Sequence, residues 1–355
     1  MNTFTKRTCW MLILPTMGVL AGACNYTTPA ASQAASATLL TDVSSIKANP
    51  EEMAELAALQ GKPRKVSSTL IAEGPESLPT ITVDPLMQQA MYEQTNYLRR
   101  PDAKKANLNG LHRLELLQTV ELLRGSSTIT PEQLAQQFDF YRVNTDLKKD
   151  QVRMTGYYTP VEKASKTQGG AFQYPIYRKP DEDIPSPDAI WEGALGGRGL
   201  ELAWFTSKQA VENAQLQGSI LVEFPNGKRE YFGFGGSTKG SGGSYVFFTR
   251  VDNTVLGAGA FPMTAGHSIA IDTRYIPIGA TLLAELPDMD ASGNITGYSY
   301  RVLFAQDRGG AIKTTNRIDI YCGIGPKALE DAYTINGHGR LWVMMPKRNT
   351  GLAMQ

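Results

Sequence analysis

Ala305-Gln-Asp-Arg-Gly-Gly-Ala-Ile-Lys313 places one aspartate, Asp307, at the end of an apolar run. Two further stretches do the same, Ser268-Ile-Ala-Ile-Asp272 and Arg317-Ile-Asp-Ile-Tyr-Cys322, the second around Asp319. Strands of this apolar, β-branched kind normally exclude aspartate. Three such placements close together predict strands that deliver carboxylates to a common cleft.

Length and composition limit the class of protein. The chain has 355 residues, 42% of them hydrophobic, with a formal net charge of +1. This composition argues against disorder and against a nucleic-acid-binding surface. The 34 glycines and 20 prolines indicate many turns and favour a strand-rich fold over a helical bundle.

The N-terminus has the pattern of an export signal. Lys6 and Arg7 precede an apolar run over residues 9–20, and small residues lead to Cys24. The pattern resembles a bacterial lipoprotein signal, which implies lipidation of Cys24 and attachment to the membrane through that lipid. Ordinary signal cleavage is the alternative. We expect a signal peptide over residues 1–24 and a flexible tether over 25–66, rich in Ala, Ser and Thr, with a short helix within it near residues 49–58.

Helical signals gather before residue 150 and strand signals after it. A helix is expected over 85–98, another over 111–123 from its apolar periodicity, and a third from the capping box that begins at Thr130. Short β segments follow, with a hairpin turn at Pro225-Asn-Gly227 and one helical interruption at 207–215. Few helices and many short strands favour a barrel or a sandwich.

The residues around the aspartates give candidate roles. Asp307 runs directly into Gly309 and Gly310, which let a bulky ligand approach the backbone, so we expect a catalytic carboxylate there. Asp319 has a structural alternative, as a solvent-facing or loop-capping residue. Asp272 has one too, as the cap of the turn that follows it.

A second half of the cleft is predicted around two tyrosines. Adjacent residues of a strand point to opposite faces, so Tyr157 and Tyr158 cannot both enter the core. At least one of them is expected to be exposed, where it would suit stacking on a sugar. The three histidines are far apart, without metal-ligand spacing, and no phosphate-binding loop is present. We therefore expect carboxylate chemistry without metal or cofactor.

These stretches together resemble the membrane-bound lytic murein transglycosylase A family. The matching motifs run in family order from about residue 80 to residue 346, and they comprise Thr155-Gly-Tyr-Tyr-Thr-Pro160, Phe172-Gln-Tyr-Pro-Ile-Tyr177, Gln217-Gly-Ser219, Asp307-Arg-Gly-Gly-Ala-Ile-Lys313 and Gly339-Arg-Leu-Trp-Val343. The resemblance implies a mainly β protein with a few helices, in which a smaller β-barrel domain is inserted into a double-psi β-barrel. The expected ranges are 67–158 and 255–348 for the double-psi barrel, 159–254 for the insert and 349–355 for a tail.

The resemblance also implies an activity and a set of roles. Family members cleave the β-1,4 bond between N-acetylmuramic acid and N-acetylglucosamine in peptidoglycan and leave a 1,6-anhydro end. The single catalytic acid/base matches Asp307, with Asp319 and Asp272 as supporting carboxylates. Thr155 and Gln217 match the sugar-binding groove. An exotransglycosylase anchored by lipid to the outer membrane, on its periplasmic side, is implied, with glycan strands as its partner.

One departure from the family keeps alternatives open. The expected insert is shortened, because Phe234-Gly-Gly236 leads through a Gly/Ser-rich stretch almost directly to Tyr245. One wall of the groove would then be open or rebuilt. A hydrolytic endoglycosidase on the same barrel, with Asp319 positioning water, and a non-catalytic peptidoglycan-binding lipoprotein are the alternative functions.

Overall fold

The computed structural model describes residues 50–348 apart from 104–107, 148–149, 239–243 and 291. The predicted signal peptide with Cys24, the first part of the tether and the tail at 349–355 lie outside the described residues. Within that range, no helix is long and apolar enough to cross a membrane.

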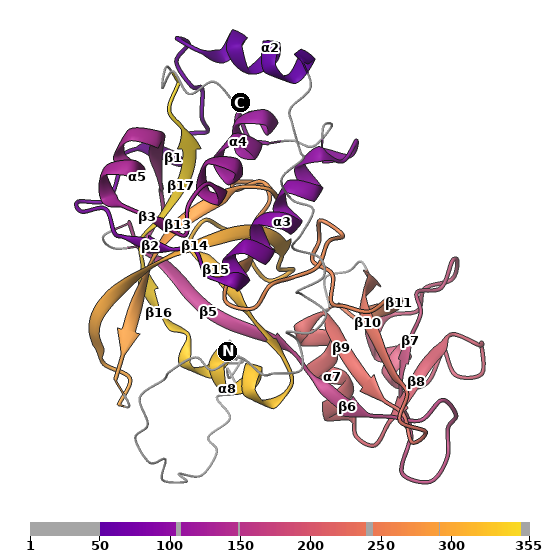
Figure 1. The fold of residues 1–355 in the computed structure, drawn as a ribbon. Helices are drawn as coiled ribbons and strands as arrows, with labels where there is room; N and C mark the ends of the chain where they lie inside the picture. The colour runs from indigo at the N-terminus through magenta and orange to yellow at the C-terminus, as the bar shows by residue number, and fades with distance from the viewer. Residues whose placement is uncertain (1–49, 104–107, 148–149, 239–243, 291, 349–355) are drawn as a thin grey trace, which may run out of the picture.

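The larger body of the molecule is built on one mixed sheet of nine strands (Figure 1). Its order across the sheet is β1-β4-β17-β13-β14-β12-β15-β5-β16. The strands are β1 (Leu70–Ala72), β4 (Phe138–Val143), β5 (Val152–Thr159), β12 (Ser268–Ile271), β13 (Thr281–Met289), β14 (Ile295–Arg308), β15 (Arg317–Ile324), β16 (Asn336–Gly339) and β17 (Leu341–Pro346). Strands from before and after the smaller lobe pair directly, since β15 lies parallel to β5.

Helices cover this sheet and close its core. They are α2 (Pro50–Leu59), α3 (Pro85–Arg99), α4 (Arg113–Arg124), α5 (Pro131–Gln137) and α8 (Pro326–Thr334), and β2 (Ile81–Thr82) pairs with β3 (Thr128–Ile129) beside them. Buried Met91 of α3 and Leu117 of α4 belong to the same apolar cluster as Leu282 and Val343 of the sheet. The predicted capping box of α5 is confirmed, because the Thr130 hydroxyl and the Gln133 side chain each bind the other's backbone N–H.

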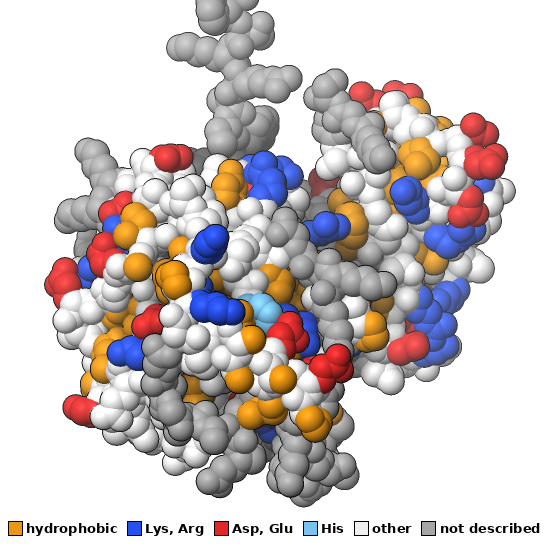
Figure 2. All heavy atoms as spheres, turned by 90° about the horizontal axis from the view of Figure 1, so that it is seen from above, with side chains coloured by type: hydrophobic (Ala, Val, Ile, Leu, Met, Phe, Trp, Pro, Cys, Tyr) orange, Lys and Arg blue, Asp and Glu red, His pale blue; other side chains and the backbone are white. Residues whose placement is uncertain are grey.

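The smaller lobe consists of the segments between β5 and β12. Its elements are β6 (Val161–Lys163), β7 (Tyr174–Tyr177), α6 (Pro187–Trp191), β8 (Glu201–Phe205), α7 (Lys208–Gln217), β9 (Ser219–Glu223), β10 (Arg229–Ser237) and β11 (Val246–Val251). They form a four-stranded sheet, β11-β10-β9-β6, and a two-stranded sheet, β7-β8, around a separate apolar core. Figure 1 shows β5 running from the larger body toward this lobe. Charged side chains of both signs are spread over the face seen in Figure 2, in keeping with the small net charge.

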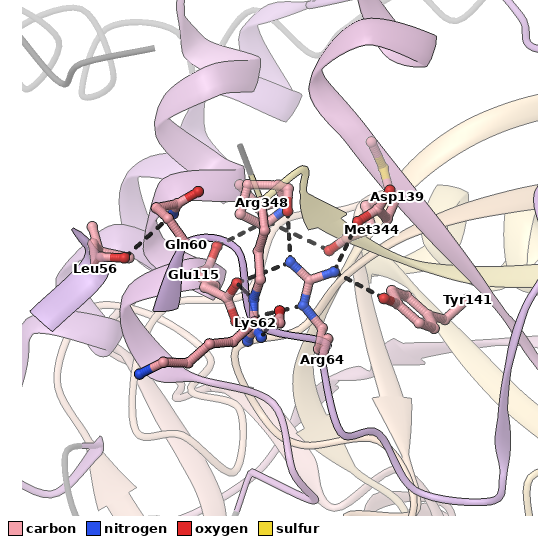
Figure 3. A network of polar contacts seen from close by, with 11 residues as sticks. Leu56, Gln60, Lys62, Arg64, Glu115, Asp139, Tyr141, Met344 and Arg348 are labelled. Carbon is pink, nitrogen blue, oxygen red and sulfur yellow. Dashed lines mark hydrogen bonds and ion pairs between the residues drawn. The ribbon is translucent and has the colours of Figure 1, made fainter. Parts of the chain in front are cut away.

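Residues 50–66 differ from the expected tether. The predicted short helix is present as α2, but it contacts the larger body: Leu56 is buried in the main core and Glu52 accepts a hydrogen bond from Arg113, Nη2 to Oε1 3.1 Å. Arg64 is held in a polar network with Glu115 of α4 (Figure 3). Linker-like composition does not reveal these contacts, because they depend on charged partners far along the chain.

Candidate active site

The predicted catalytic stretches meet on one face of the sheet. Asp307 of β14 lies opposite Ala270 of β12, Ala270 lies opposite Asp319 of β15, and Asp319 lies opposite Thr155 of β5. Residues directly opposite one another in a sheet project to the same side. Because alanine is small and strands lie about 4.8 Å apart, a gap about two strand spacings wide separates the backbones that carry the two aspartates.

This face is polar and partly open, whereas the opposite face is buried. Thr155, Tyr157, Asp307 and Asp319 are all half-buried on the first side. The alternate residues of β15, Ile318 and Ile320, are fully packed in the core. Strand alternation therefore explains how an otherwise apolar sheet presents carboxylates and hydroxyls at one place.

Asp307 is held through both of its carboxylate oxygens. Its Oδ2 accepts a hydrogen bond from the Tyr157 hydroxyl at 2.8 Å, and its Oδ1 accepts one from the backbone N–H of Ala258 at 2.9 Å. Burial raises the pKa of Asp307, and the hydrogen bonds from Tyr157 and from backbone N–H groups partly offset that rise. The site thus favours a protonated carboxyl more than water does.

Asp319 is ionically paired rather than free. Arg317 binds it with both ends of its guanidinium, Nε to Oδ1 at 2.7 Å and Nη2 to Oδ2 at 2.9 Å. The Thr155 hydroxyl donates to Oδ1 as well, and Arg317 Nη2 also reaches Thr155 Oγ1 at 3.2 Å. The three side chains form a fixed polar unit two strands away from Asp307.

Asp272 has the structural role that the sequence offered as an alternative, the cap of the turn that follows it. It is only 8% exposed. Its Oδ1 accepts a hydrogen bond from the backbone N–H of Arg274 at 3.0 Å, and its Oδ2 accepts one from Nη2 of the same residue at 2.5 Å. The Arg274 side chain holds the pKa of Asp272 below its usual range. The carboxylate of Asp272 therefore caps the turn after β12. The raised pKa of Asp307 is caused mainly by its own burial and not by the charge of Asp272.

Tyr157 and Tyr158 point to opposite sides, as expected for adjacent strand residues, and only Tyr157 reaches the site. Tyr158 is 7% exposed, and its hydroxyl accepts a hydrogen bond from Asn213 of α7 at 2.9 Å. The side chain of Gln217 accepts the backbone N–H of Tyr158 at 3.2 Å. Both residues join the smaller lobe to β5. Tyr158 is therefore buried rather than exposed for stacking on a sugar, whereas Gln217 is half-buried and its contact with substrate stays a prediction.

The two glycines after Asp307 differ from each other. A side chain at Gly309 would lie 2.7 Å from Ile312, so its turn needs glycine for its own packing. Gly310 faces open space, where nothing lies within 4 Å of an added Cβ. Of the two, only Gly310 fits the expectation of room for a ligand.

The loop that supplies the Ala258 N–H was not expected from the sequence. It is anchored from α3, where Phe261 packs on Tyr97 with ring centroids 5.1 Å apart. Arg100, directly after α3, donates to the carbonyl oxygens of Gly259 and Ala260 at 2.7 and 3.1 Å. Since the functional group is a backbone N–H, no side chain in this loop signals the role.

Glycine also allows this loop to approach β14. A Cβ at Gly257 would lie 2.3 Å from the carbonyl oxygen of Gln306, the residue before Asp307. The Gln306 side chain is buried, and it binds the backbone of Ala90 and the side chain of Ser268 at 3.0 and 2.5 Å. The position of Asp307 is therefore set from several elements.

Among the described residues, no group of three His, Cys, Asp or Glu side chains is placed to hold a metal ion.

This geometry defines a class of two-lobed, mainly β proteins with a half-buried carboxyl on an open sheet face. Two family models match the chain, "3D domain" over residues 267–345 and "MltA specific insert domain" over 153–189. The chain belongs to the membrane-bound lytic murein transglycosylase A family. The resemblance inferred from the motifs is thereby confirmed, and all three aspartates lie in the first matched segment.

Named relatives support this assignment. The membrane-bound lytic murein transglycosylase A of Escherichia coli K12 is 35% identical over 247 residues, 56% of this chain and 67% of the relative. That of Vibrio cholerae is 28% identical over 242 residues, 55% of this chain and 66% of the relative.

Solved structures agree on the fold. The crystal structure of the E. coli protein with bound chitohexaose has a TM-score of 0.66 and 27% identity, covering 81% of this chain and 98% of that one. A membrane-bound lytic murein transglycosylase from Agrobacterium tumefaciens, at 22% identity and a TM-score of 0.62, covers 73% of this chain and 92% of its own. The expected double-psi β-barrel fold is thereby confirmed.

Proposed function

We propose that this protein is a peptidoglycan lytic transglycosylase that cleaves the β-1,4 bond between N-acetylmuramic acid and N-acetylglucosamine. Family membership supports the substrate, and a relative's structure holds a chitohexaose. The observation that carries the chemistry is Asp307, a half-buried carboxyl with a raised pKa on the open sheet face. A general acid needs such a pKa to keep its proton near neutral pH.

Asp307 serves both steps of the reaction. In its protonated form it donates to the leaving glycosidic oxygen as the C1–O bond breaks. The resulting carboxylate then takes the proton of the muramyl C6 hydroxyl, whose oxygen bonds to C1 and closes the 1,6-anhydro ring. The carboxyl regains its proton, and no water is consumed. One carboxylate is sufficient because the nucleophile belongs to the substrate.

The pairing of Asp319 supports this route over hydrolysis. A hydrolase needs a second carboxylate that activates water or attacks the sugar. Here both oxygens of Asp319 are occupied by Arg317, and the Thr155 hydroxyl binds one of them as well. With its oxygens occupied by these donors, Asp319 is better suited to fixing Thr155 and Arg317 as contacts for the glycan.

The proposed cellular place follows from the relatives and from the N-terminus. The relatives are membrane-bound enzymes, which supports a location in the Gram-negative envelope. The lipoprotein-like signal supports a periplasmic enzyme anchored to the outer membrane through lipid on Cys24. Mass spectrometry of the N-terminal peptide tests the anchor, since lipid adds a diagnostic mass to Cys24 and ordinary cleavage adds none.

Digestion of purified sacculi tests the activity. We expect soluble muropeptides with 1,6-anhydro ends, identified by mass spectrometry. Products heavier by one water would instead identify a hydrolase. Binding to sacculi without release of any soluble product would identify a non-catalytic peptidoglycan-binding protein.

A further inference from the structure

The proposed reaction requires Asp307 to be stable in one position both with and without its proton. Its two oxygens have partners of different kinds, the N–H of Ala258 at Oδ1 and the hydroxyl of Tyr157 at Oδ2. A backbone N–H can only donate a hydrogen bond, whereas a hydroxyl can donate or accept by rotating about its C–O bond. The neutral acid is therefore accommodated best with its proton on Oδ2, directed at the tyrosine oxygen.

Resting on the proposed function, we infer that Tyr157 is a positioning residue that holds the proton of Asp307 on Oδ2 and supports both charge states of the carboxyl. When Asp307 is neutral and no glycan is bound, the Tyr157 oxygen accepts its proton in a hydrogen bond. When a glycan is bound, this proton turns on Oδ2 from the tyrosine to the glycosidic oxygen, and the Tyr157 hydroxyl is free to donate to Oδ2 as charge develops there. When Asp307 is ionised, the hydroxyl turns and donates to Oδ2. The carboxyl thus passes through donor and acceptor states without displacement of a heavy atom.

The surroundings of Tyr157 restrict it to this role. Its ring packs against Tyr321 with centroids 5.4 Å apart, and its hydroxyl also contacts the sulfur of Met263 at 3.7 Å, a weak acceptor. Burial raises the pKa of Tyr157 well above its usual range, and the nearby Asp307, Tyr321 and Asp319 add to the rise. Tyr157 therefore stays protonated at working pH and acts as a hydrogen-bond partner, not as a base.

The same geometry separates this role from sugar stacking. Phenylalanine keeps the aromatic ring and its packing but removes the hydroxyl. If Tyr157 positions the proton, loss of the hydroxyl alone reduces turnover. If it only stacks on a sugar, the phenylalanine variant binds and reacts as the parent does.

The decisive variant is Tyr157→Phe, assayed on soluble glycan strands by release of anhydro products across a pH series. We expect kcat to fall about 10- to 100-fold, the range for losing one hydrogen bond to a charged group, with KM within about twofold. Because the Tyr157 hydrogen bond lowers the pKa of Asp307, its loss raises that pKa. The alkaline limb of the kcat profile, which follows loss of the acid's proton, should therefore move to higher pH.

Tyr300→Phe is the matched control. Tyr300 lies on β14, the strand of Asp307, but its hydroxyl donates to Glu285 at 3.4 Å and not to Asp307. This variant should keep the parent's kcat and pH profile. Parent-like kcat and pH limbs in Tyr157→Phe, or a raised KM with unchanged kcat, would overturn the inference.

A fluorinated tyrosine at position 157 provides a second measurement that preserves the packing. Its phenol is more acidic and donates more strongly to an ionised carboxylate, so the alkaline limb should move to lower pH, opposite to the phenylalanine variant. An unshifted limb would contradict the inference even if Tyr157→Phe did not fold. The proposed function fails separately, if the parent protein itself releases no anhydro product.

Discussion

At position 307, the side chain that performs the proposed chemistry is one that folding disfavours in its charged form. Burial raises its pKa above the aspartate reference of about 3.9. A group with a raised folded-state pKa contributes stability that is fully present below its unfolded pKa and is lost as pH rises through the folded value. Asp307 should therefore weaken the fold at neutral pH.

Asp307→Asn tests this stability effect. The variant and the parent should melt at similar temperatures near pH 3.5, and the variant should become progressively more stable than the parent as pH rises through the pKa of Asp307. Thermal unfolding followed by circular dichroism between pH 3.5 and 8 measures the difference. A difference that does not change with pH would contradict the account.

Asp272 provides a control of opposite sign. Its pKa is lowered by Arg274, so its contribution to stability is present above about pH 3.9 and is lost as pH falls through the folded pKa. Asp272→Asn should therefore be less stable than the parent at neutral pH, and this deficit should shrink on acidification.

Some residues of the site could be predicted from the sequence alone and others could not. Asp307 and Asp319 could be predicted to share a site because aspartates interrupt apolar strand runs. Tyr157 was a candidate because adjacent strand residues point to opposite faces, and Thr155 was a candidate only through the family resemblance. Which of the two adjacent tyrosines faces the site depends on the neighbouring lobe, which buries Tyr158. The Ala258 N–H could not be predicted, since any residue except proline carries one.

Among the elements, β5 places two site residues and joins the two lobes. Thr155 and Tyr157 face the site, while Gly156 between them faces α8. A Cβ on Gly156 would lie 2.5 Å from the Cα of Ala332 and 2.7 Å from its carbonyl oxygen. The contact with α8 thus sets how far β5 can shift, and with it the position of the Tyr157 hydroxyl.

Gly156→Ala should move α8 away from β5. We expect a loss of about 1–3 kcal/mol in the free energy of unfolding, the range for overpacking, together with reduced release of anhydro products. Urea denaturation and the sacculus assay measure the two effects. Gly169→Ala is the control, because an added Cβ there meets nothing within 4 Å. Equal stability of the two variants would show that the predicted crowding is absent.

On the scale of the whole molecule, one buried network ties distant parts of the chain together (Figure 3). Glu115 of α4 is bound by Arg64 at 2.9 Å and by Arg348 at 2.8 Å, and all these side chains are nearly buried. Arg64 also binds Asp139 and Tyr141 of β4 at 3.1 and 2.9 Å. The segments that begin and end the described structure are therefore fastened to the same helix.

Arg64→Met should destabilise the protein strongly. Removing one partner of a buried ion pair leaves unsatisfied groups, and we expect a loss of about 3–5 kcal/mol. Chemical denaturation measures this loss. Arg229→Met, which breaks an exposed pair with Glu223, should change stability by less than about 1 kcal/mol. A similarly small effect for Arg64→Met would contradict a structural role for the network.

This network involves contacts that could not be predicted from the sequence. Apolar periodicity predicted α4, and capping chemistry predicted the start of α5, because both signals are local. The composition of residues 50–66 predicts a tether, whereas the contacts that fix this segment depend on Arg113 and Glu115, which only the fold brings near it. Local composition resembles a linker even where Arg64 is buried against the barrel.

The central claim is that Asp307 moves the proton while the muramyl unit attacks its own C1. Its most direct test is release of 1,6-anhydro muropeptides from sacculi by Asp307→Asn, with circular dichroism and melting measured on the same sample. The account predicts a folded protein that releases no anhydro product. Substantial release of anhydro muropeptides by the folded variant would contradict it.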